Sequence, residues 1–272
     1  MPNQTSFDVV VHPAALSELT VLSDWLDFMS WPPAKIVAFV GEDPAIAEEL
    51  TKICDSRGVN LDVLGVKSGK EFFHSESKSL FEQFEAVSAD LALLIKLDTL
   101  PFRSARDNWL EEVLTVKEQT GALFISGGTQ PYKADDPTSS QEFLKTKRVS
   151  NNFLMIAPQD WLRIHTARGT RENIEDRYAT ERNLEFHCAE TEDFGIRCVN
   201  SPDWRVFHTQ VWGNDVFALR EKFRAGYRVQ RFLKGYQDDL YHPWQAHYLH
   251  AAPNALKLAR IKFGEFRQSL TR

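Results

Sequence analysis

The sequence has few cysteines and no long apolar run, and both absences limit the class of protein. Its three cysteines, Cys54, Cys188 and Cys198, are far apart and form no Cys-x-x-Cys pair, so they do not indicate a disulfide framework. A run of about 18 apolar residues, as in a membrane-spanning helix, occurs nowhere, and the N-terminal residues lack the basic lead and apolar core of a signal peptide. We therefore expect a cytoplasmic protein in a reducing compartment.

Positive charge is scarcer than negative charge. The 272 residues include 32 lysines and arginines against 38 aspartates and glutamates, which gives a net charge of -6 and a pI near 5.8. Affinity for duplex nucleic acid comes largely from basic residues that neutralise phosphates, so we expect no nucleic-acid partner. The apolar share of 43% is sufficient for a sizeable core. We expect one α/β domain over residues 1–212 and a helical C-terminal extension over residues 213–272, packed on it.

Strand-like and helix-like patterns alternate along most of the chain. The expected strands are short β-branched or apolar runs, at residues 7–11, 35–40, 60–66, 91–98, 122–128, 149–158 and 203–212. The expected helices have apolar residues at helical spacing, or begin at a proline and end at a glycine, at residues 18–31, 44–58, 77–90, 106–121 and 159–169. This alternation predicts crossover connections and a mainly parallel, Rossmann-like sheet with helices on both faces.

Ligands of such sheets bind beyond the carboxyl ends of the strands, so the residues that follow the expected strands are the first candidates for a site. These residues are His12, Glu42, Asp43, Lys67, Asp98 and Thr129. Asp98 is the sharpest of them, because its carboxylate follows an apolar strand and would be costly to bury alone. We expect it to emerge into the crevice, where a cation or a ligand compensates its charge. The alternative is that Asp98 only caps the turn before Pro101.

The segment around Asp98 resembles the aspartate-containing signature of the GT-A glycosyltransferases, especially their family 2. In that family an apolar strand ends in Asp-x-Asp and often continues Thr-Leu-Pro. Here Asp98 to Pro101 matches the second Asp and its tail, and Lys96 occupies the place of the first. The resemblance implies a GT-A-like fold in which Asp98 ligates a Mn²⁺ or Mg²⁺ ion that bridges the donor diphosphate. Lys96 would instead contact the diphosphate as a positive charge, or point into solvent.

Two other positions match the family in the same order. The run 35–40 is similar to the second family strand, whose acidic end contacts the nucleotide base, and Glu42 or Asp43 would take that donor-binding place. A later strand of the family ends in a histidine, and His208 falls on it. The resemblance implies that His208 completes the metal site with Asp98. The alternative for His208 is a core histidine that is satisfied by a backbone carbonyl.

The resemblance also implies a catalytic base. Glu181 falls on the acidic residue of the family's Glu-Asp-x-x-Leu block, with Arg182 in place of the companion Asp, and Phe194-Gly195-Ile196 follows as a Gly-Tyr-x-Ile-like turn. In inverting members this acid removes the proton of the acceptor hydroxyl, so Glu181 is the expected general base. Glu185 and Asp176 are nearby substitutes for that role. The alternative is that Glu181 is an exposed glutamate on a helix face, since the segment is highly charged.

The C-terminal part contains two further features. His242, His247 and His250 are close in sequence, but without a third well-placed ligand we expect helix-surface or oligomer contacts there rather than a metal site. The basic, amphipathic segment 256–267 would suit peripheral contact with an anionic membrane, where many lipid-linked acceptors reside. Packing on its own domain or on a second copy of the chain is favoured, because most amphipathic helices cover a core.

Together these residues predict a glycosyltransferase that moves a sugar from a nucleotide-sugar donor to a hydroxyl acceptor, either a glycan or a lipid-linked molecule. Two alternatives remain. Lys96 and Arg182 both replace acids of the family, which favours a non-catalytic binding or scaffolding protein in polysaccharide assembly. A nucleotidyltransferase also uses carboxylates at strand ends, but it consumes a nucleoside triphosphate and releases pyrophosphate.

Overall fold

The computed structural model describes residues 5–68, 76–103, 109–127, 136–137, 143–172, 179–198, 204–208 and 220–221. The chain divides into two compact units, Met1–His208 and Thr209–Arg272. Of the second unit only residues 220–221 are described, so the expected helical extension and its three histidines lie outside the described residues. All elements named below belong to the first unit.

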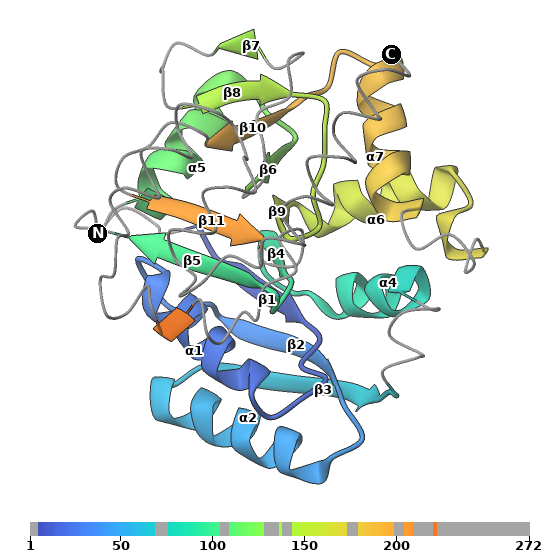
Figure 1. The fold of residues 1–272 in the computed structure, drawn as a ribbon. Helices are drawn as coiled ribbons and strands as arrows, with labels where there is room; N and C mark the ends of the chain where they lie inside the picture. Colours follow the sequence, from blue (N-terminus) through green and yellow to red (C-terminus); the bar gives the residue numbers. More distant parts are fainter. Residues whose placement is uncertain are drawn as a thin grey trace, which may run out of the picture. The chain divides into compact units, whose positions relative to one another are not determined.

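Among the described residues, nine strands form one sheet in the order β3-β2-β1-β4-β9-β6-β10-β8-β7 (Figure 1). Their bounds are β1 Phe7–Val11, β2 Lys35–Val40, β3 Asn60–Val66, β4 Leu91–Ile95, β6 Phe124–Ser126, β7 Asp136–Pro137, β8 Phe143–Thr146, β9 Phe153–Ile156 and β10 Gly195–Cys198. The first four strands in this order are parallel. β9 runs antiparallel to both of its neighbours, and β8 runs antiparallel to β10 and β7, so the sheet is mixed.

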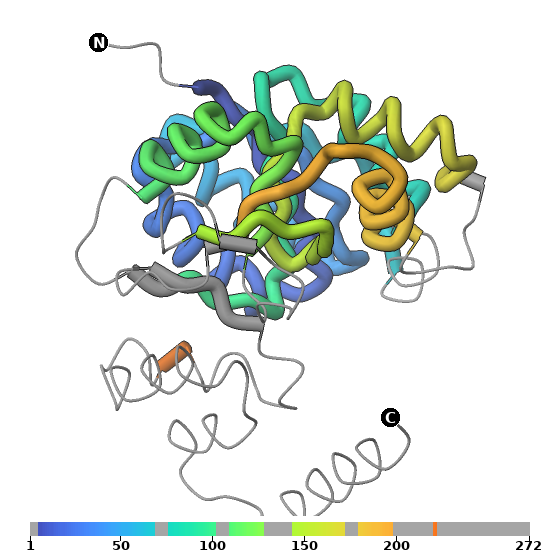
Figure 2. The backbone as a smooth tube through the Cα atoms, turned by 90° about the horizontal axis from the view of Figure 1, so that it is seen from above, coloured from blue at the N-terminus to red at the C-terminus, as the bar shows by residue number. Residues whose placement is uncertain are grey.

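Helices cover both faces of this sheet. They are α1 Glu18–Phe28, α2 Pro44–Arg57, α4 Glu76–Ala86, α5 Trp109–Thr120, α6 Pro158–Ala167 and α7 Ala179–Glu190, with a short 3-10 helix, η1, at Thr170–Glu172. In both views α5 lies on one side of the strands and the pair α6 and α7 on the other (Figures 1 and 2). The predicted α/β, Rossmann-like fold is confirmed.

The two faces of the sheet are packed differently. On one face, side chains of α4, α6 and α7 form a single apolar cluster with the strands, and Trp161 of α6 stacks on Phe84 of α4 with their ring centroids 4.1 Å apart. On the other face, aromatic rings connect α1 and α5 to β9. Phe153 stacks on Trp25, with centroids 5.5 Å apart, and Phe28 stacks on Trp109 at 4.4 Å. Alternate residues of β9 therefore serve opposite cores, as the period of two in a strand requires.

The central strands are apolar along their whole length. β1 and β4 are buried at every position, as expected for strands that are covered on both faces. Asp8 of β1 is the one polar residue in these two strands. It is also fully buried, and its carboxylate accepts hydrogen bonds from the backbone N–H groups of Ser88, at 2.8 Å, and Ala89, at 3.2 Å. β3 forms an edge of the sheet and is only partly covered. The helices therefore leave this edge of the sheet partly uncovered. The candidate functional residues lie beyond the carboxyl ends of the parallel strands.

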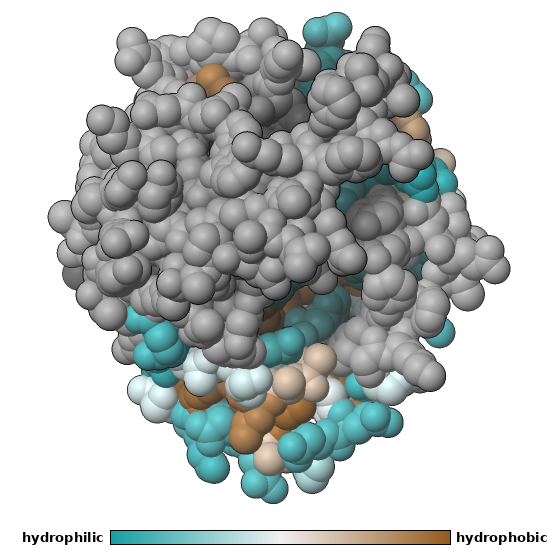
Figure 3. All heavy atoms as spheres, in the orientation of Figure 1, coloured by the Kyte–Doolittle hydropathy of each residue, from teal (hydrophilic) through white to brown (hydrophobic). Residues whose placement is uncertain are grey.

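The described surface is mainly hydrophilic. On the face in Figure 3, hydrophilic residues surround small apolar areas wherever described residues reach the surface. The large apolar side chains exposed among the described residues are Leu16, Val63, Val66 and Phe186. No helix in the described ranges combines the length and the apolar character that crossing a bilayer requires.

Candidate functional site

Charged side chains gather where the four parallel strands end. Because β3, β2, β1 and β4 are parallel neighbours, the segments that follow them lie along one edge of the sheet. Two of these segments are in close contact. The N–H of Gly41, after β2, donates to the Pro13 carbonyl, after β1, at 2.9 Å. A Cβ on Gly41 would lie 2.4 Å from the Ala14 carbonyl oxygen, so glycine is required for this approach.

Asp98 lies in a turn rather than in the strand itself. β4 ends at Ile95, and the Lys96 N–H donates to the Asn152 carbonyl at 3.2 Å. A new strand, β5 Thr99–Arg103, then pairs antiparallel with β11 Trp204–His208. The apolar run predicted one strand up to Asp98, and no local pattern indicated β5. The turn nevertheless keeps Asp98 directly beyond the carboxyl end of β4, where the site was expected.

The pairing of β5 with β11 also places the backbone of His208. His208 lies opposite Thr99 in the register, so its backbone is next to the residue that follows Asp98. Its side chain is outside the described part of the chain, and its expected role as a metal ligand stays a prediction. Thr99 itself is buried, and its carbonyl accepts a hydrogen bond from the Trp25 indole at 3.2 Å, which ties the turn to α1.

Lys96 forms an ion pair with a residue that the sequence analysis did not single out. Its Nζ lies 3.0 Å from Oε1 of Glu76, the first residue of α4, whose side chain is 14% exposed. Burial by itself would lower the pKa of this ammonium, but Glu76 first, and then Glu181 and Asp98, raise the pKa above its ordinary value. Lys96 is therefore a cation held among carboxylates, although its side chain is still 36% exposed. The only signal for Glu76 in the sequence was its place at a helix start.

Glu181 belongs to the same electrostatic group. It lies in the first turn of α7, and its Oε1 accepts a hydrogen bond from the Asn151 N–H at 2.8 Å. Burial raises the pKa of Glu181 above its ordinary value, and the Asn151 N–H and the Lys96 ammonium oppose the rise without cancelling it. Glu181 is therefore not an exposed glutamate on a helix face. A half-buried carboxylate with a raised pKa is suited to accept a proton, as a general base does.

The two substitutes for Glu181 have different outcomes. Glu185 is one turn further along α7 and is bound on both oxygens: one pairs with Arg148 at 3.0 Å and the other accepts the Val149 N–H at 3.1 Å. Both oxygens of Glu185 are therefore engaged with the segment that precedes β9. Asp176 lies outside the described residues. Of the two acids that the structure describes, Glu181 is the one that interacts with Lys96.

Two further groups of this edge come from β1 and β3. His12 follows β1, and its Nε2 is hydrogen-bonded to Oε1 of Gln83. Burial first, and then the positive charges of Lys96 and Lys67, lower the pKa of His12 to about 4 against the opposing effect of the Gln83 hydrogen bond. The ammonium of Lys67, after β3, lies 3.8 Å from the centroid of the Phe39 ring. The strand-end rule named both His12 and Lys67, but not their partners.

The two acids expected near the nucleotide base lie apart from this group. Asp43 is the N-cap of α2, and its carboxylate accepts the Ala45 N–H at 3.0 Å. Glu42 is exposed. Neither has a contact that identifies it with donor binding, so this role stays a prediction. Thr129 lies outside the described residues.

The described side chains around Asp98 do not provide the ligands of a Mn²⁺ or Mg²⁺ site. Such ions take several oxygen or imidazole ligands. Within the described ranges, no group of three His, Cys, Asp or Glu side chains is arranged to hold an ion. Lys96 places a positive charge beside Asp98, and Glu76 is engaged with that charge at 3.0 Å. The described side chains around Asp98 therefore do not by themselves form such an ion site, and the side chain of His208, the other expected ligand, lies outside the described residues.

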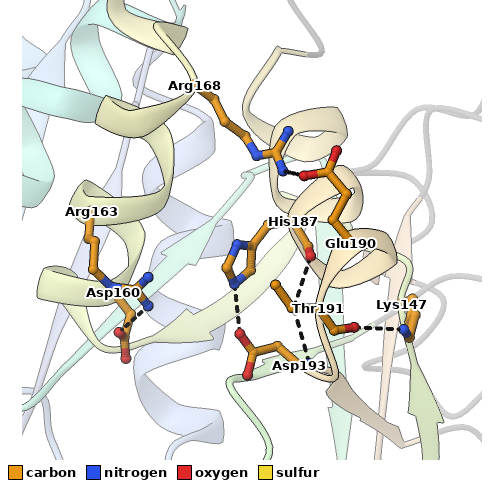
Figure 4. Close-up of polar contacts among 8 residues, drawn as sticks. All are labelled: Lys147, Asp160, Arg163, Arg168, His187, Glu190, Thr191 and Asp193. Carbon is orange, nitrogen blue, oxygen red and sulfur yellow. Dashed lines mark hydrogen bonds and ion pairs between the residues drawn. The ribbon is translucent and has the colours of Figure 1, made fainter.

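A second polar group, on α6 and around the last turn of α7, has a different character (Figure 4). Its contacts are His187 with Asp193 at 2.7 Å, Lys147 with the Thr191 carbonyl at 3.1 Å, Arg168 with Glu190 at 2.5 Å and Arg163 with Asp160 at 2.9 Å. Most of these side chains reach the solvent: Glu190 is 66% exposed and Asp193 46%. The first three contacts connect the end of α7 and the residues after it to neighbouring segments, while the pair of Arg163 and Asp160 lies within α6.

Comparison with known proteins gives a fold but no sequence family. No protein-family model matches the chain, and no curated protein matches it. One similar solved structure is UDP-glucose pyrophosphorylase complexed with UDP-glucose, with a TM-score of 0.50 and 8% identity over 74% of this chain and 91% of that chain.

Two further solved structures are also similar. A mannosyltransferase from Pyrobaculum calidifontis, in complex with GDP-Man and Mn²⁺, has a TM-score of 0.47 and 12% identity over 92% of this chain and 71% of that chain. TarS 1–349 from S. aureus has a TM-score of 0.44 and 9% identity over 90% and 69%. Likeness at this level of identity establishes a fold and not an activity. The described part of the chain has a GT-A-like α/β fold, shared with an enzyme whose structure holds a nucleotide sugar.

Proposed function

We propose that the protein is a glycosyltransferase that moves a sugar from a nucleotide-sugar donor to a hydroxyl acceptor. One observation carries this proposal: Glu181 and the turn from Lys96 to Asp98, about eighty residues apart in sequence, share one electrostatic group beyond the carboxyl end of β4. Ligands of open α/β sheets bind at this edge. A partly buried base beside a cation is the pair that transfer from a diphosphate leaving group requires.

Each residue has a defined task in this mechanism. The acceptor oxygen attacks the anomeric carbon, the bond from that carbon to the diphosphate oxygen breaks, and the hydroxyl proton passes to Glu181. Lys96 offsets the negative charge that develops on the departing nucleoside diphosphate. Glu76 first, and then Glu181 and Asp98, keep the Lys96 ammonium charged. The finer assignment to family 2, with a glycan or lipid-linked acceptor, rests on the sequence motifs alone.

A donor screen tests the proposal. UDP- and GDP-sugars are offered with and without Mn²⁺, and donor binding, donor hydrolysis and transfer to hydroxyl acceptors are measured for the wild type and for Asp98→Asn. We expect at least one donor to bind and to be hydrolysed slowly, and Asp98→Asn to reduce hydrolysis. If no nucleotide sugar binds under either condition, the protein is not a glycosyltransferase.

A nucleotidyltransferase is the second candidate, because a cation beside a strand-end carboxylate also suits a nucleoside triphosphate. The two candidates differ in product. A nucleotidyltransferase joins a nucleoside triphosphate to a sugar 1-phosphate and releases pyrophosphate. Pyrophosphate release without transfer to a hydroxyl acceptor would favour it over the glycosyltransferase. Nucleotide binding without either product would favour a binding or scaffolding protein.

A further inference from the structure

Two consecutive residues before β9 contact both Lys96 and Glu181. The Asn152 carbonyl accepts the Lys96 N–H at 3.2 Å, and the Asn151 N–H donates to Oε1 of Glu181 at 2.8 Å. The side chains of Lys96 and Glu181 also interact electrostatically, and each charge favours the charged form of the other. The backbone therefore brings an ammonium group and the proposed base to the same place beyond the end of β4.

The Lys96 ammonium is nevertheless paired with a different acid. Its Nζ lies 3.0 Å from Oε1 of Glu76, whereas Glu181 acts on it through a longer electrostatic interaction. Burial lowers the pKa of this ammonium, and Glu76 first and then Glu181 more than offset that effect. Two carboxylates thus attract one ammonium group, and Glu76 holds it at contact distance.

Glu76 is placed by a helix that is attached to the sheet from within. Gln83 of α4 is fully buried, and its amide donates to the backbone carbonyls of Val11 in β1 and Val37 in β2, each at 3.1 Å. The Glu76 side chain is 14% exposed, so its charge is only weakly screened by water. It also lies in the first turn of α4, where the helix dipole stabilises a negative charge. Glu76 is therefore a fixed partner for Lys96.

The charged groups that act on Glu181 are few. Burial is the largest cause of its raised pKa; the Asn151 N–H and then Lys96 oppose the rise, and Glu76 and Glu185 add to it. The other titratable groups on the elements around α7 have partners of their own: Arg148 with Glu185, Arg168 with Glu190, Arg171 with Glu85, and His165 with the Thr180 carbonyl. Glu76 acts on Glu181 in two ways, by repulsion and by its hold on Lys96.

We infer that Glu76 is a positioning residue for the proposed base: it holds the Lys96 ammonium at the start of α4 and so prevents a close ion pair between Lys96 and Glu181 that would weaken the base. This inference rests on the proposed function, in which Glu181 accepts the proton of the acceptor hydroxyl. A carboxylate in contact with an ammonium group is stabilised in its charged form and accepts a proton less readily.

The titration of Glu181 tests this inference without any substrate. The carboxyl carbon of Glu181 is followed by NMR in the chain labelled with ¹³C-glutamate, and its signal is assigned by its loss in Glu181→Gln. In Glu76→Gln the released ammonium should move to Glu181, so Glu181 should titrate at a lower pH than in the wild type. Glu85→Gln is the matched control, because it makes the same change on α4 in an ion pair with Arg171 at 3.0 Å, and it should leave the titration unchanged.

A second comparison separates the hold on Lys96 from simple repulsion. In a Lys96→Met chain, Glu76→Gln removes only the repulsion between two carboxylates. Its effect on the Glu181 titration should therefore be clearly smaller than in the chain that contains Lys96. Thermal unfolding of each variant shows that it is folded before its titration is compared.

The rate of transfer gives a readout that a merely structural role would not produce. In Glu76→Gln the acid limb of kcat/KM should move to lower pH together with the Glu181 titration. On the plateau, kcat should fall by much less than the about 10²- to 10⁴-fold expected for loss of a general base, because the base is weakened and not removed.

The outcomes separate this inference from the proposed function. An unchanged Glu181 titration in Glu76→Gln would overturn the inference and leave the glycosyltransferase standing. An equal effect of Glu76→Gln with and without Lys96 would also overturn it, because Glu76 would then act by repulsion alone. If no nucleotide sugar binds in the donor screen, the proposed function fails, while the titration still decides whether Glu76 keeps Lys96 from Glu181.

Discussion

The two ends of α7 hold acidic residues in opposite surroundings. In the first turn, Glu181 is partly buried, accepts one backbone N–H, and interacts with Lys96 of the strand-end turn. In the last turn, Glu190 is 66% exposed and pairs with Arg168 at the surface (Figure 4). The acid at the first end is partly buried, and the acid at the second end is largely exposed.

This difference indicates that charge can affect chemistry at the first turn of α7, and that at the last turn it contributes only to holding the helix in place. Removing water strengthens electrostatic interactions, so a few groups shift the pKa of Glu181. Exposed ion pairs are screened and contribute about 0–1 kcal/mol each. A proton acceptor is expected at the buried end, and substitutions at the exposed end should leave activity unchanged. Each prediction below tests one part of this contrast.

The largest effect is expected for Glu181→Gln. Loss of a general base reduces kcat by about 10²- to 10⁴-fold, while nucleotide binding should persist. Since burial raises the pKa of Glu181, and the base must be deprotonated, wild-type kcat/KM should fall with decreasing pH on a limb above the ordinary range of a glutamate. The measurement is a pH profile of transfer by the wild type and the variant.

Glu190→Gln is the matched control for this experiment, because it makes the same change on the same helix at the exposed end. It should leave kcat and its pH profile unchanged. Equal losses from the two substitutions would remove the distinction between the ends, and a Glu181→Gln variant with full activity would exclude Glu181 as the base.

Asn151→Ala should produce the next largest effect, on stability. Asn151 is buried, and its side chain donates to the Thr180 hydroxyl at 2.7 Å, which fixes the start of α7. The lost hydrogen bond should lower the free energy of unfolding by about 1–2 kcal/mol. Urea unfolding measures this, with Asn60→Ala as the control, since Asn60 makes an exposed hydrogen bond at 3.1 Å. A smaller loss for Asn151→Ala than for Asn60→Ala would contradict the buried anchor.

The parallel half of the fold was predictable because its signals are local. The buried strands are continuous apolar runs, and α2 has a complete set of end signals: Asp43 caps it, Pro44 begins it, and Gly58 ends it at a φ of 64°. Such signals depend on residues that are adjacent in sequence. The strand-end rule then named His12, Lys67 and the Asp98 turn, which the structure places at the expected edge.

The other half was less predictable because its strands are short and are stabilised by pairing with strands that are distant in sequence. Gly195 and Ile196 were expected in a turn, but they lie in β10, which is bound between β6 and β8. β5 was missed because its pairing partner, β11, is about a hundred residues away. Glu76 was missed for the same reason: its importance comes from an ion pair with Lys96, and no local pattern encodes a contact between a helix start and a distant strand end.

A pH effect on stability is expected from His165, which connects α6 to the buried end of α7. Its ring nitrogens lie 2.7 Å from the Trp161 carbonyl and 2.9 Å from the Thr180 carbonyl. Burial first lowers the pKa of His165; Arg168 and His187 lower it too, against the two carbonyls. A lowered folded-state pKa means that its contribution to stability is present above pH 6.5 and is lost as pH falls, by at most about 1.4 kcal/mol per pH unit.

Urea unfolding of the wild type and of His165→Gln from pH 7.5 to 5 measures this slope. The variant should lose less stability than the wild type as the pH falls. His187→Gln, at the last turn of α7, is the comparison: it removes only a minor cause of the lowered His165 pKa, so most of the wild-type slope should remain in it. If the unfolding free energy of His165→Gln falls with pH as steeply as that of the wild type, the acid sensitivity comes from another group. His12, whose pKa is also lowered, would then be tested first.

The smallest effect is expected for the pair of Arg168, which is 22% exposed, and Glu190, which is 66% exposed. A double-mutant cycle with Arg168→Gln and Glu190→Gln should give a coupling free energy below about 1 kcal/mol, because both charges gain little from an interaction that water and salt screen. The coupling should decrease further in 1 M salt, where the screening length is about 3 Å. A coupling well above 1 kcal/mol that resists salt would show that the exposed end of α7 is as strongly held by charge as the buried end, and the contrast between the two ends would no longer locate the chemistry.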